Sequence, residues 1–291
     1  MENQNNDTYC IDKPIDDKIL EEIKNYQKLF FGNRYNFPVN NLPKEIHTIT
    51  FCDLFNQSVD NLPSELLNLT FGEYFNMPVY NLPLRLINLK FGDWFNRPVD
   101  NLPSTIQNII FGWDFNQPVN NLPIGLLNLS FGGSFNQQVD NLPIELKEIK
   151  FKLKFNQPVD YLPSKIQKIT FSLDFNKPVD NLPVGLLNLK FGARFNQPVN
   201  YLPSSIQKLK FGDRFNQLVD NLPPEIQKLT FGDEFNQSVD NLPSKIKKLI
   251  FGYKFNQPID KLPIGLECLT LSKNYDKPLN NLPVSVKITR I

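Results

Sequence analysis

The sequence predicts a repeat solenoid with one parallel β-sheet of short strands, built from about thirteen coils of 20 residues. Starting at Phe31, a 20-residue pattern recurs without insertion through twelve repeats to residue 270, followed by a degenerate thirteenth. Within the repeats, proline occurs only at positions 8, 13 and, once, 14, and six other positions are regularly apolar. Twenty residues cannot bury a core alone, so the repeats are expected to stack and to bury these apolar columns against one another.

The prolines place the strand of each coil. The consensus repeat is F-G-x-x-F-N-Q-P-V-D-N-L-P-x-x-I-x-x-L-x. Interior strands exclude proline because it lacks a backbone donor, so the strand must lie near repeat positions 18 to 2. At 208–212 the side chains alternate, and Leu209 and Phe211 are expected to point inward, with positions 18 and 20 pointing outward.

The remaining arc of each coil is expected to form an irregular, polyproline-II-like convex side with little helix, because residues before proline avoid helical angles. Glycine occupies position 2 in nine repeats and predicts an exit turn with unusual backbone angles. The apolar columns are positions 1, 5, 9, 12, 16 and 19, and the first two contain 23 of the 25 phenylalanines. Their rings are expected to stack offset along the solenoid at roughly the strand spacing of about 4.8 Å.

Two polar columns accompany the apolar ones. Asparagine holds position 6 from Asn36 to Asn256. The structural interpretation is a ladder of amides that satisfy one another and the turn backbone; the alternative is a row of ligand amides. Aspartate recurs at position 10, as in Asp60 and Asp100, and is replaced there by Asn40. This exchange favours turn formation by the side chain over calcium binding.

Both ends depart from the pattern. Residues 1–30 are predicted to form an N-terminal cap with an amphipathic helix at 17–28, started by Asp16 or Asp17. Within it, the motif at 11–16 resembles the F-N-Q-P-V-D part of the repeat. Residues 31–270 are the twelve regular repeats, and 271–291 are predicted to form a C-terminal cap, in which Thr289 replaces the position-19 leucine.

Composition disfavours several classes of protein. The net charge is +1, and no apolar run is long enough for a membrane span or a signal peptide. Three scattered cysteines fit neither a disulfide framework nor a metal site, which indicates an intracellular location, in the cytoplasm of the host or source cell. With one histidine and no singled-out carboxylate pair, no catalytic, cofactor or metal site is expected, and a β-helical hydrolase is a minor alternative.

Aromatic outliers provide the first candidate partner-binding site. Tyr74, Trp94 and Trp113 occupy repeat positions 4, 4 and 3 of three successive repeats. Tryptophan and tyrosine are enriched in binding hot spots, so these rings are candidates for contact with a partner. The alternative is that they fold back over the phenylalanine columns as additional core. Their acidic neighbours are Glu73, Asp93 and Asp114.

Segregated charge provides the second candidate site. Residues 1–150 carry a net charge of −7 and residues 151–291 carry +8. Outward strand positions of six consecutive repeats hold a basic stripe of Lys150, Lys168, Lys190, Lys208, Lys210, Lys228 and Lys248. Such a stripe suits an acidic protein, whereas nucleic acid is disfavoured because no exposed aromatics interleave with the lysines. The alternative is a solvated face without a partner.

The recurrent motif also resembles a known family. Phe-Asn-Gln-Pro at 115–118 and 195–198, and Phe-Asn-Lys-Pro at 175–178, are similar to the FNIP repeat of social amoebae and of large DNA viruses of amoebae. The L-P-x-x-I-x-x-L-x-F stretch looks like the short leucine-rich repeat of bacterial effectors, which implies a leucine-rich-repeat-like solenoid. The resemblance covers 31–290 and implies a binding scaffold. Many members of the family carry an N-terminal F-box, for which residues 1–30 are too few.

The leading functional hypothesis is therefore a non-enzymatic protein–protein interaction scaffold that recognises a host protein or a substrate. A self-assembling structural component is the main alternative, since oppositely charged ends favour head-to-tail association. A ubiquitin-ligase substrate adaptor is a minor alternative.

Overall fold

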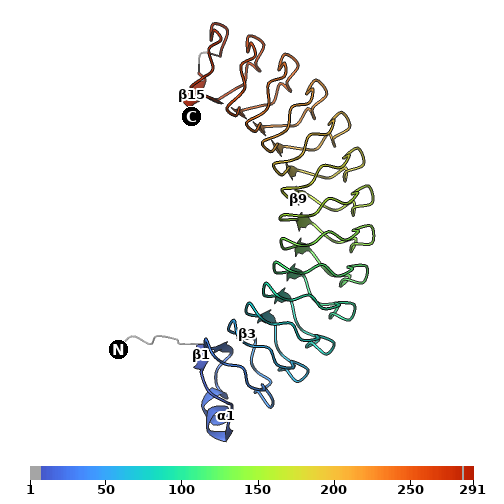
Figure 1. Ribbon diagram of the computed structural model, residues 1–291, viewed down its shortest axis with the longest axis vertical. Helices are drawn as coiled ribbons and strands as arrows, with labels where there is room; N and C mark the ends of the chain where they lie inside the picture. Colours follow the sequence, from blue (N-terminus) through green and yellow to red (C-terminus); the bar gives the residue numbers. More distant parts are fainter. Residues whose placement is uncertain (1–7, 284) are drawn as a thin grey trace, which may run out of the picture. The chain divides into compact units, whose positions relative to one another are not determined.

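The computed structural model describes residues 8–283 and 285–291, which form two compact units (Figure 1). Of the described residues, the N-terminal unit contains 8–137 and 141–146, and the C-terminal unit contains 138–140, 147–283 and 285–291. Positions 1–7 of the predicted N-terminal cap lie outside the described residues. In each unit the strands are parallel and follow one another in chain order. The predicted solenoid with a parallel sheet is therefore confirmed.

The elements of the N-terminal unit are β1 (Thr8–Ile11), α1 (Asp17–Ile23), β2 (Lys28–Phe31), β3 (Thr48–Thr50), β4 (Asn68–Thr70), β5 (Asn88–Lys90), β6 (Asn108–Ile110) and β7 (Asn128–Ser130). Those of the C-terminal unit are β8 (Glu148–Lys150), β9 (Lys168–Thr170), β10 (Asn188–Lys190), β11 (Lys208–Lys210), β12 (Lys228–Thr230), β13 (Lys248–Ile250), β14 (Cys268–Leu271) and β15 (Lys287–Arg290). Most strands cover only repeat positions 18 to 20. In β11, Leu209 is buried and both flanking lysines are exposed, as the alternation predicts.

The six apolar columns form the core. Phenylalanines at positions 1 and 5 of one coil stack most closely, with the ring centroids of Phe211 and Phe215 3.7 Å apart. Between coils the centroids are farther apart, at 5.5 Å for Phe211 and Phe231 and 6.1 Å for Phe215 and Phe235. These ring distances exceed the expected strand spacing of roughly 4.8 Å, and the position-5 rings, which are farther from the strand along the chain, are the more widely separated.

The position-6 asparagines connect successive coils, which confirms their structural interpretation. The Asn216 side-chain oxygen Oδ1 accepts a hydrogen bond from the backbone N–H of Asn236 at 2.9 Å. It also accepts one from Nε2 of Gln237 at 3.1 Å. The same pattern recurs at Asn96 with Asn116 and Gln117. Glutamine at position 7 of the consensus, to which the sequence analysis assigned no role, is therefore a member of the ladder.

Glycine at position 2 has a different role from the predicted one. Among the described residues no glycine has a positive φ. Instead, the coils approach closely at this position: a Cβ on Gly212 would lie 1.9 Å from the carbonyl oxygen of Gly192. Ser172 at this position is buried, and its hydroxyl donates to the Phe155 carbonyl at 2.6 Å, whereas Lys152 at the same position is exposed. Close packing between coils, rather than a special turn, explains the glycines.

Aspartates at position 10 also link coils. The Asp220 carboxylate accepts a hydrogen bond from the Asn241 side chain of the following coil at 2.9 Å. The Asp160 carboxylate accepts one from Asn181 at 3.0 Å. The carboxylates thus bridge to the next coil, in addition to standing at a turn as the sequence predicted.

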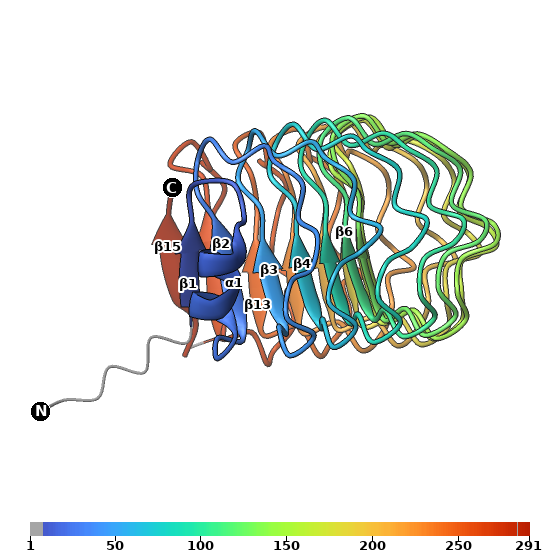
Figure 2. The ribbon, with the colours of Figure 1, turned by 90° about the horizontal axis from the view of Figure 1, so that it is seen from below.

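The N-terminal end adds one further coil. Residues Thr8 and Ile11 of β1 pair with Lys28 and Phe31 of β2, so Ile11 takes repeat position 1. The resemblance of 11–16 to the F-N-Q-P-V-D motif, which placed Ile11 at position 5, was wrong in register. Helix α1 is shorter than predicted, and Asp16 is its N-cap, accepting a hydrogen bond from the Ile19 N–H at 2.8 Å. The helix lies at the start of the unit beside β1 (Figure 2).

The last coil is one residue shorter than the others. In β15, Ile288 pairs with Leu269 of β14, a separation of 19 residues. Ile288, and not Thr289 as the sequence predicted, therefore takes the position-19 place. At this end Arg290 donates to the carbonyl oxygens of Ser272 at 3.0 Å and Tyr275 at 3.3 Å.

We expect Asn216→Leu to lower the free energy of unfolding by about 1–3 kcal/mol, because the donors of Asn236 and Gln237 lose their acceptor. Chemical denaturation would measure the change. Asn216→Asp keeps an acceptor oxygen at the same place and is the matched control. Equal stability of the leucine variant and the wild-type protein would contradict a structural role for the ladder.

Candidate functional site

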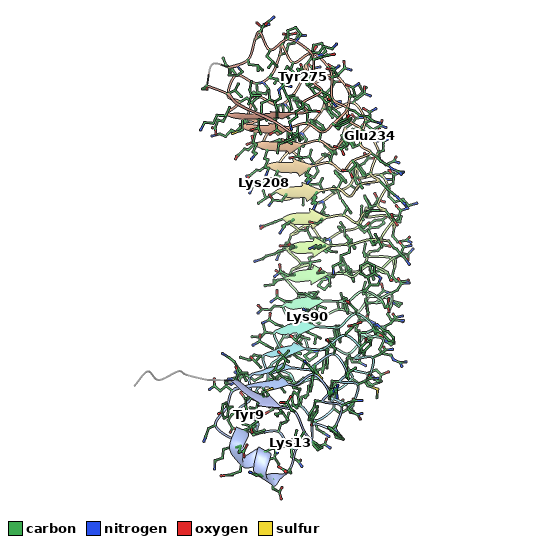
Figure 3. The ribbon with its side chains drawn as sticks, turned by 60° about the vertical axis from the view of Figure 1, so that its left-hand side comes forward. Tyr9, Lys13, Lys90, Lys208, Glu234 and Tyr275 are labelled. Carbon is green, nitrogen blue, oxygen red and sulfur yellow. The ribbon has the colours of Figure 1, made fainter. Side chains whose placement is uncertain are left out.

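The predicted lysine stripe lies on the outward side of strands β8–β13, and we call it the lysine face (Figure 3). All seven lysines are exposed. Parallel pairing places Lys208, Lys228 and Lys248 in one row at position 18. It places Lys190 beside Lys210 at position 20. The structure therefore brings the sequence-predicted lysines together on one surface of the C-terminal unit.

Two shallow hollows lie along this face. The first, of about 500 Å³, is lined by lysines together with Thr170, Thr230 and Ile250. The second, of about 380 Å³, lies at the strand ends and includes Lys150 and Gly192 in its lining. Each hollow thus combines ammonium groups with methyl-bearing side chains.

Most of the lysine face is not neutralised within the chain. Glu148 pairs with Lys168 at 2.7 Å. Within the described residues, the other six lysines of the face have no carboxylate partner. Parallel rows of like charge repel one another, so the face is poised to bind a partner of opposite sign.

The predicted aromatic site lies in the N-terminal unit. The rings of Tyr74 and Trp94 are in edge-to-face contact, with centroids 4.9 Å apart and planes at 82°. Trp113 lies instead over the backbone of Gly133, where a Cβ would come within 2.6 Å of the indole. Trp94 is 54% exposed and Trp113 is 46% exposed. The tryptophans therefore do not join the buried phenylalanine columns, and their contact with a partner stays a prediction.

The sequence interpretation missed an exposed apolar row at repeat position 14. In the N-terminal unit this row contains Leu84, Ile124 and Ile144, and in the C-terminal unit Val184 and Ile264. The sequence contains a signal for this row, because repeat position 14 holds serine in some repeats and a large apolar residue in others, outside the six core columns.

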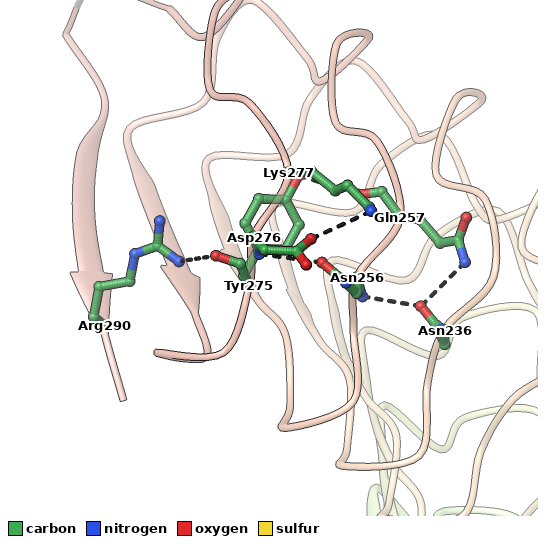
Figure 4. Close-up of polar contacts among 7 residues, drawn as sticks. All are labelled: Asn236, Asn256, Gln257, Tyr275, Asp276, Lys277 and Arg290. Carbon is green, nitrogen blue, oxygen red and sulfur yellow. Dashed lines mark hydrogen bonds and ion pairs between the residues drawn. The ribbon is translucent and has the colours of Figure 1, made fainter.

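Perturbed titratable groups lie mainly near the ends of the chain. Burial raises the pKa of Tyr35 to about 12, and burial, with a smaller contribution from Asp260, raises the pKa of Tyr275 to about 12. Burial and then Asp12 raise the pKa of Cys10, which disfavours the reactive thiolate. Hydrogen bonding with Asn256 and then Lys277 lowers the pKa of Asp276 (Figure 4).

These shifts arise from packing and from the end of the asparagine ladder. The Tyr35 hydroxyl donates to the Pro38 carbonyl at 3.0 Å. Across 8–283 and 285–291, no three His, Cys, Asp or Glu side chains are grouped to hold a metal ion. Over the same residues, no helix is long and apolar enough to cross a bilayer.

The repeat itself decides the family. The sequence profile described as FNIP Repeat matches residues 75–114, 95–134, 115–154, 175–213 and 215–254, which together cover more than half of the chain. The chain belongs to the FNIP-repeat family. No match is found among curated protein sequences.

Two solved structures are similar to this FNIP-repeat protein. CroV588 of the giant virus CroV, described as a novel circular LRR protein, is 31% identical, with a TM-score of 0.70. The alignment covers 94% of this chain but 50% of CroV588, so the chain spans about half the length of that relative. YopM from Yersinia enterocolitica is 18% identical, with a TM-score of 0.54, and 94% and 74% of the two chains are covered. The FNIP repeats therefore form a leucine-rich-repeat-like scaffold.

We expect Gly133→Ala to displace Trp113, because the added methyl group would overlap the indole. In a Trp94→Phe background, Trp113 is the one remaining tryptophan, so its emission should move to longer wavelength as it becomes more exposed. Gly185→Ala is the control, since its Cβ would make an ordinary contact of 3.7 Å. Unchanged emission of the Gly133 variant would mean that the indole does not lie on this glycine.

Proposed function

We propose that this FNIP-repeat protein is a non-enzymatic interaction scaffold whose lysine face binds an acidic protein partner. The proposal includes an intracellular location, in the cytoplasm of the host or source cell. Leucine-rich-repeat-like scaffolds typically bind proteins over an extended surface. The function thus requires a long, regular surface rather than a catalytic cleft.

The arrangement of the lysine face is the observation that carries the proposal. Six exposed lysines without a carboxylate partner among the described residues lie on neighbouring strands in fixed register. The adjoining hollows offer Thr170 and Ile250 for apolar contact beside the charges. An acidic peptide segment would gain both ion pairs and burial there, whereas the face offers no exposed ring on which a nucleic acid base could stack.

A self-assembling structural component is the second candidate. The observation in its favour is strand β15, whose four residues are all exposed and whose Ile288 is 42% exposed. An exposed edge strand can pair with a strand of another chain. No described contact favours the hydrolase or the ligase-adaptor alternative.

We expect Lys208→Glu with Lys210→Glu to weaken binding of a fluorescent oligoglutamate peptide by about tenfold or more, because two attractive contacts become repulsive. Fluorescence anisotropy at low and at physiological salt would measure the dissociation constant. Lys154→Glu with Lys273→Glu is the matched control, since it makes the same change in net charge away from the strands.

Equal loss of affinity in both double variants would contradict the lysine face and indicate a response to net charge alone. Equally tight binding of single-stranded DNA to the wild-type protein would contradict the preference for an acidic protein. Melting temperatures within about 2 °C of wild type would show that the variants are folded, since exposed substitutions have little effect on stability.

A further inference from the structure

The N-terminal unit carries a second surface, of opposite charge. It consists of repeat positions 3 and 4 in the four coils that begin at residues 51, 71, 91 and 111, and we call it the turn row. Its apolar members are Leu54, Tyr74, Trp94 and Trp113, and its acidic members are Asp53, Glu73, Asp93 and Asp114. No basic residue occupies these positions in the four coils.

Hydrogen bonds between coils hold the turn row in place. The backbone N–H of Tyr74 donates to the Asp53 carbonyl at 2.9 Å, and that of Trp94 donates to the Glu73 carbonyl at 2.9 Å. The N–H of Asp114 donates to the Asp93 carbonyl at 2.7 Å. The backbone that carries these side chains is thus already ordered by hydrogen bonds between coils, so less conformational entropy is lost when a partner binds.

The aromatic members are anchored but remain accessible. Tyr74 and Trp94 support each other edge to face at 4.9 Å, and Trp113 rests on Gly133. About half of each indole is open to solvent. Large rings held by neighbours and exposed to water are typical anchors for a partner.

The acidic members are not neutralised. Among the described residues, no cationic side chain pairs with Asp53, Glu73, Asp93 or Asp114. Two matching acids in the C-terminal unit do have partners: Glu234 pairs with Lys254 at 2.7 Å and Asp174 with Arg194 at 3.0 Å. Both of these acids stand at repeat position 4, where Asp114 of the turn row has no such partner. The position-3 acids Asp213 and Asp233 of the C-terminal unit resemble those of the turn row, since no cationic side chain pairs with them among the described residues.

One carboxylate also fixes an aromatic residue. Asp93 Oδ1 accepts a hydrogen bond from the backbone N–H of Trp113 at 3.1 Å. Its other oxygen has no intramolecular hydrogen bond among the described contacts. The carboxylate therefore positions Trp113 and can still accept a donor from a ligand.

We propose that the turn row is a docking surface for a cationic, arginine-containing segment of a partner protein. Guanidinium groups stack on indole and phenol rings and pair with carboxylates in the same contact, a combination that an ammonium group makes less well. The turn row alternates the two kinds of group over adjacent coils. This site is separate from the proposed function of the lysine face, because it lies in the other unit and selects the opposite charge.

Intrinsic fluorescence reports on this surface directly, because Trp94 and Trp113 are the two tryptophans of the chain. We expect an oligoarginine peptide to change the emission of the full-length protein saturably, and an oligoglutamate peptide to leave it unchanged. An oligolysine peptide should bind more weakly than oligoarginine. Equal affinity for the two cationic peptides would overturn the role of the rings and leave only charge attraction.

Variants identify the contributing groups, with anisotropy of a labelled oligoarginine peptide as the readout. Trp94→Ala should weaken binding about tenfold. A triple variant should weaken oligoarginine binding at least as strongly; it combines Glu73→Gln, Asp93→Asn and Asp114→Asn. The amide side chains retain hydrogen-bond acceptors, so the turns should stay folded. Tyr253→Ala with Asp213→Asn is the matched control, since it alters repeat position 3 in the C-terminal unit.

Full affinity in either turn-row variant, or equal loss in the matched control, would overturn the proposal. Analytical ultracentrifugation of the protein alone provides a further check. If tryptophan emission shifts with protein concentration as oligomers form, a second copy of the chain supplies the cation, and a separate partner is excluded. Loss of oligoarginine binding in the turn-row variants with unchanged oligoglutamate binding would support the turn row independently of the lysine face.

Discussion

The polar contact between successive coils at repeat position 6 is the constraint on which the rest of the structure depends. A coil of 20 residues with a three-residue strand cannot satisfy its own backbone donors. The asparagine side chain supplies the missing acceptor, so the N–H of Asn236 is bound by Asn216 in the preceding coil. That contact requires each residue to lie directly beside the equivalent residue of the next coil, 20 positions along the chain. It therefore explains why the repeat tolerates no insertion from residue 31 to residue 270.

Fixed register has a direct consequence for function. Positions that contact the next coil are determined by the fold, as Gly212 shows by its close approach to the Gly192 carbonyl. Outward positions of the strands and the exit turns are free to vary, and equivalent residues then lie side by side. A preference for one residue type at one repeat position thus produces a continuous row of that type on the surface. Lysines form such a row over β8–β13, and acidic and aromatic residues form one along the turn row. A scaffold of this kind acquires binding surfaces by substitution alone, without a change of fold.

Features that follow from local patterns in the sequence were predicted correctly. Proline placement located the strands, and the inward Leu209 and outward Lys208 followed from alternation. Features that depend on distances between coils were not predicted. The packing role of Gly212, the entry of Gln237 into the ladder and the bridge from Asn241 to Asp220 each require a three-dimensional neighbour. The shorter last coil, which places Ile288 at repeat position 19, was not predicted because a count of 20 residues from Leu269 leads to Thr289. At the candidate sites, the sequence identified the aromatic cluster, but the contact of Trp113 with Gly133 depends on the missing Cβ.

Amide hydrogen exchange of the intact protein, measured by nuclear magnetic resonance, tests the central constraint most directly. If asparagine side chains bind the next coil, the backbone amides of Asn196, Asn216 and Asn236 should exchange as slowly as those of the strands, although they lie outside the strands. The amide of Leu229 in β12 provides the internal reference. Exchange of the three asparagine amides at the rate of unbonded turn residues, with Leu229 still protected, would contradict the account.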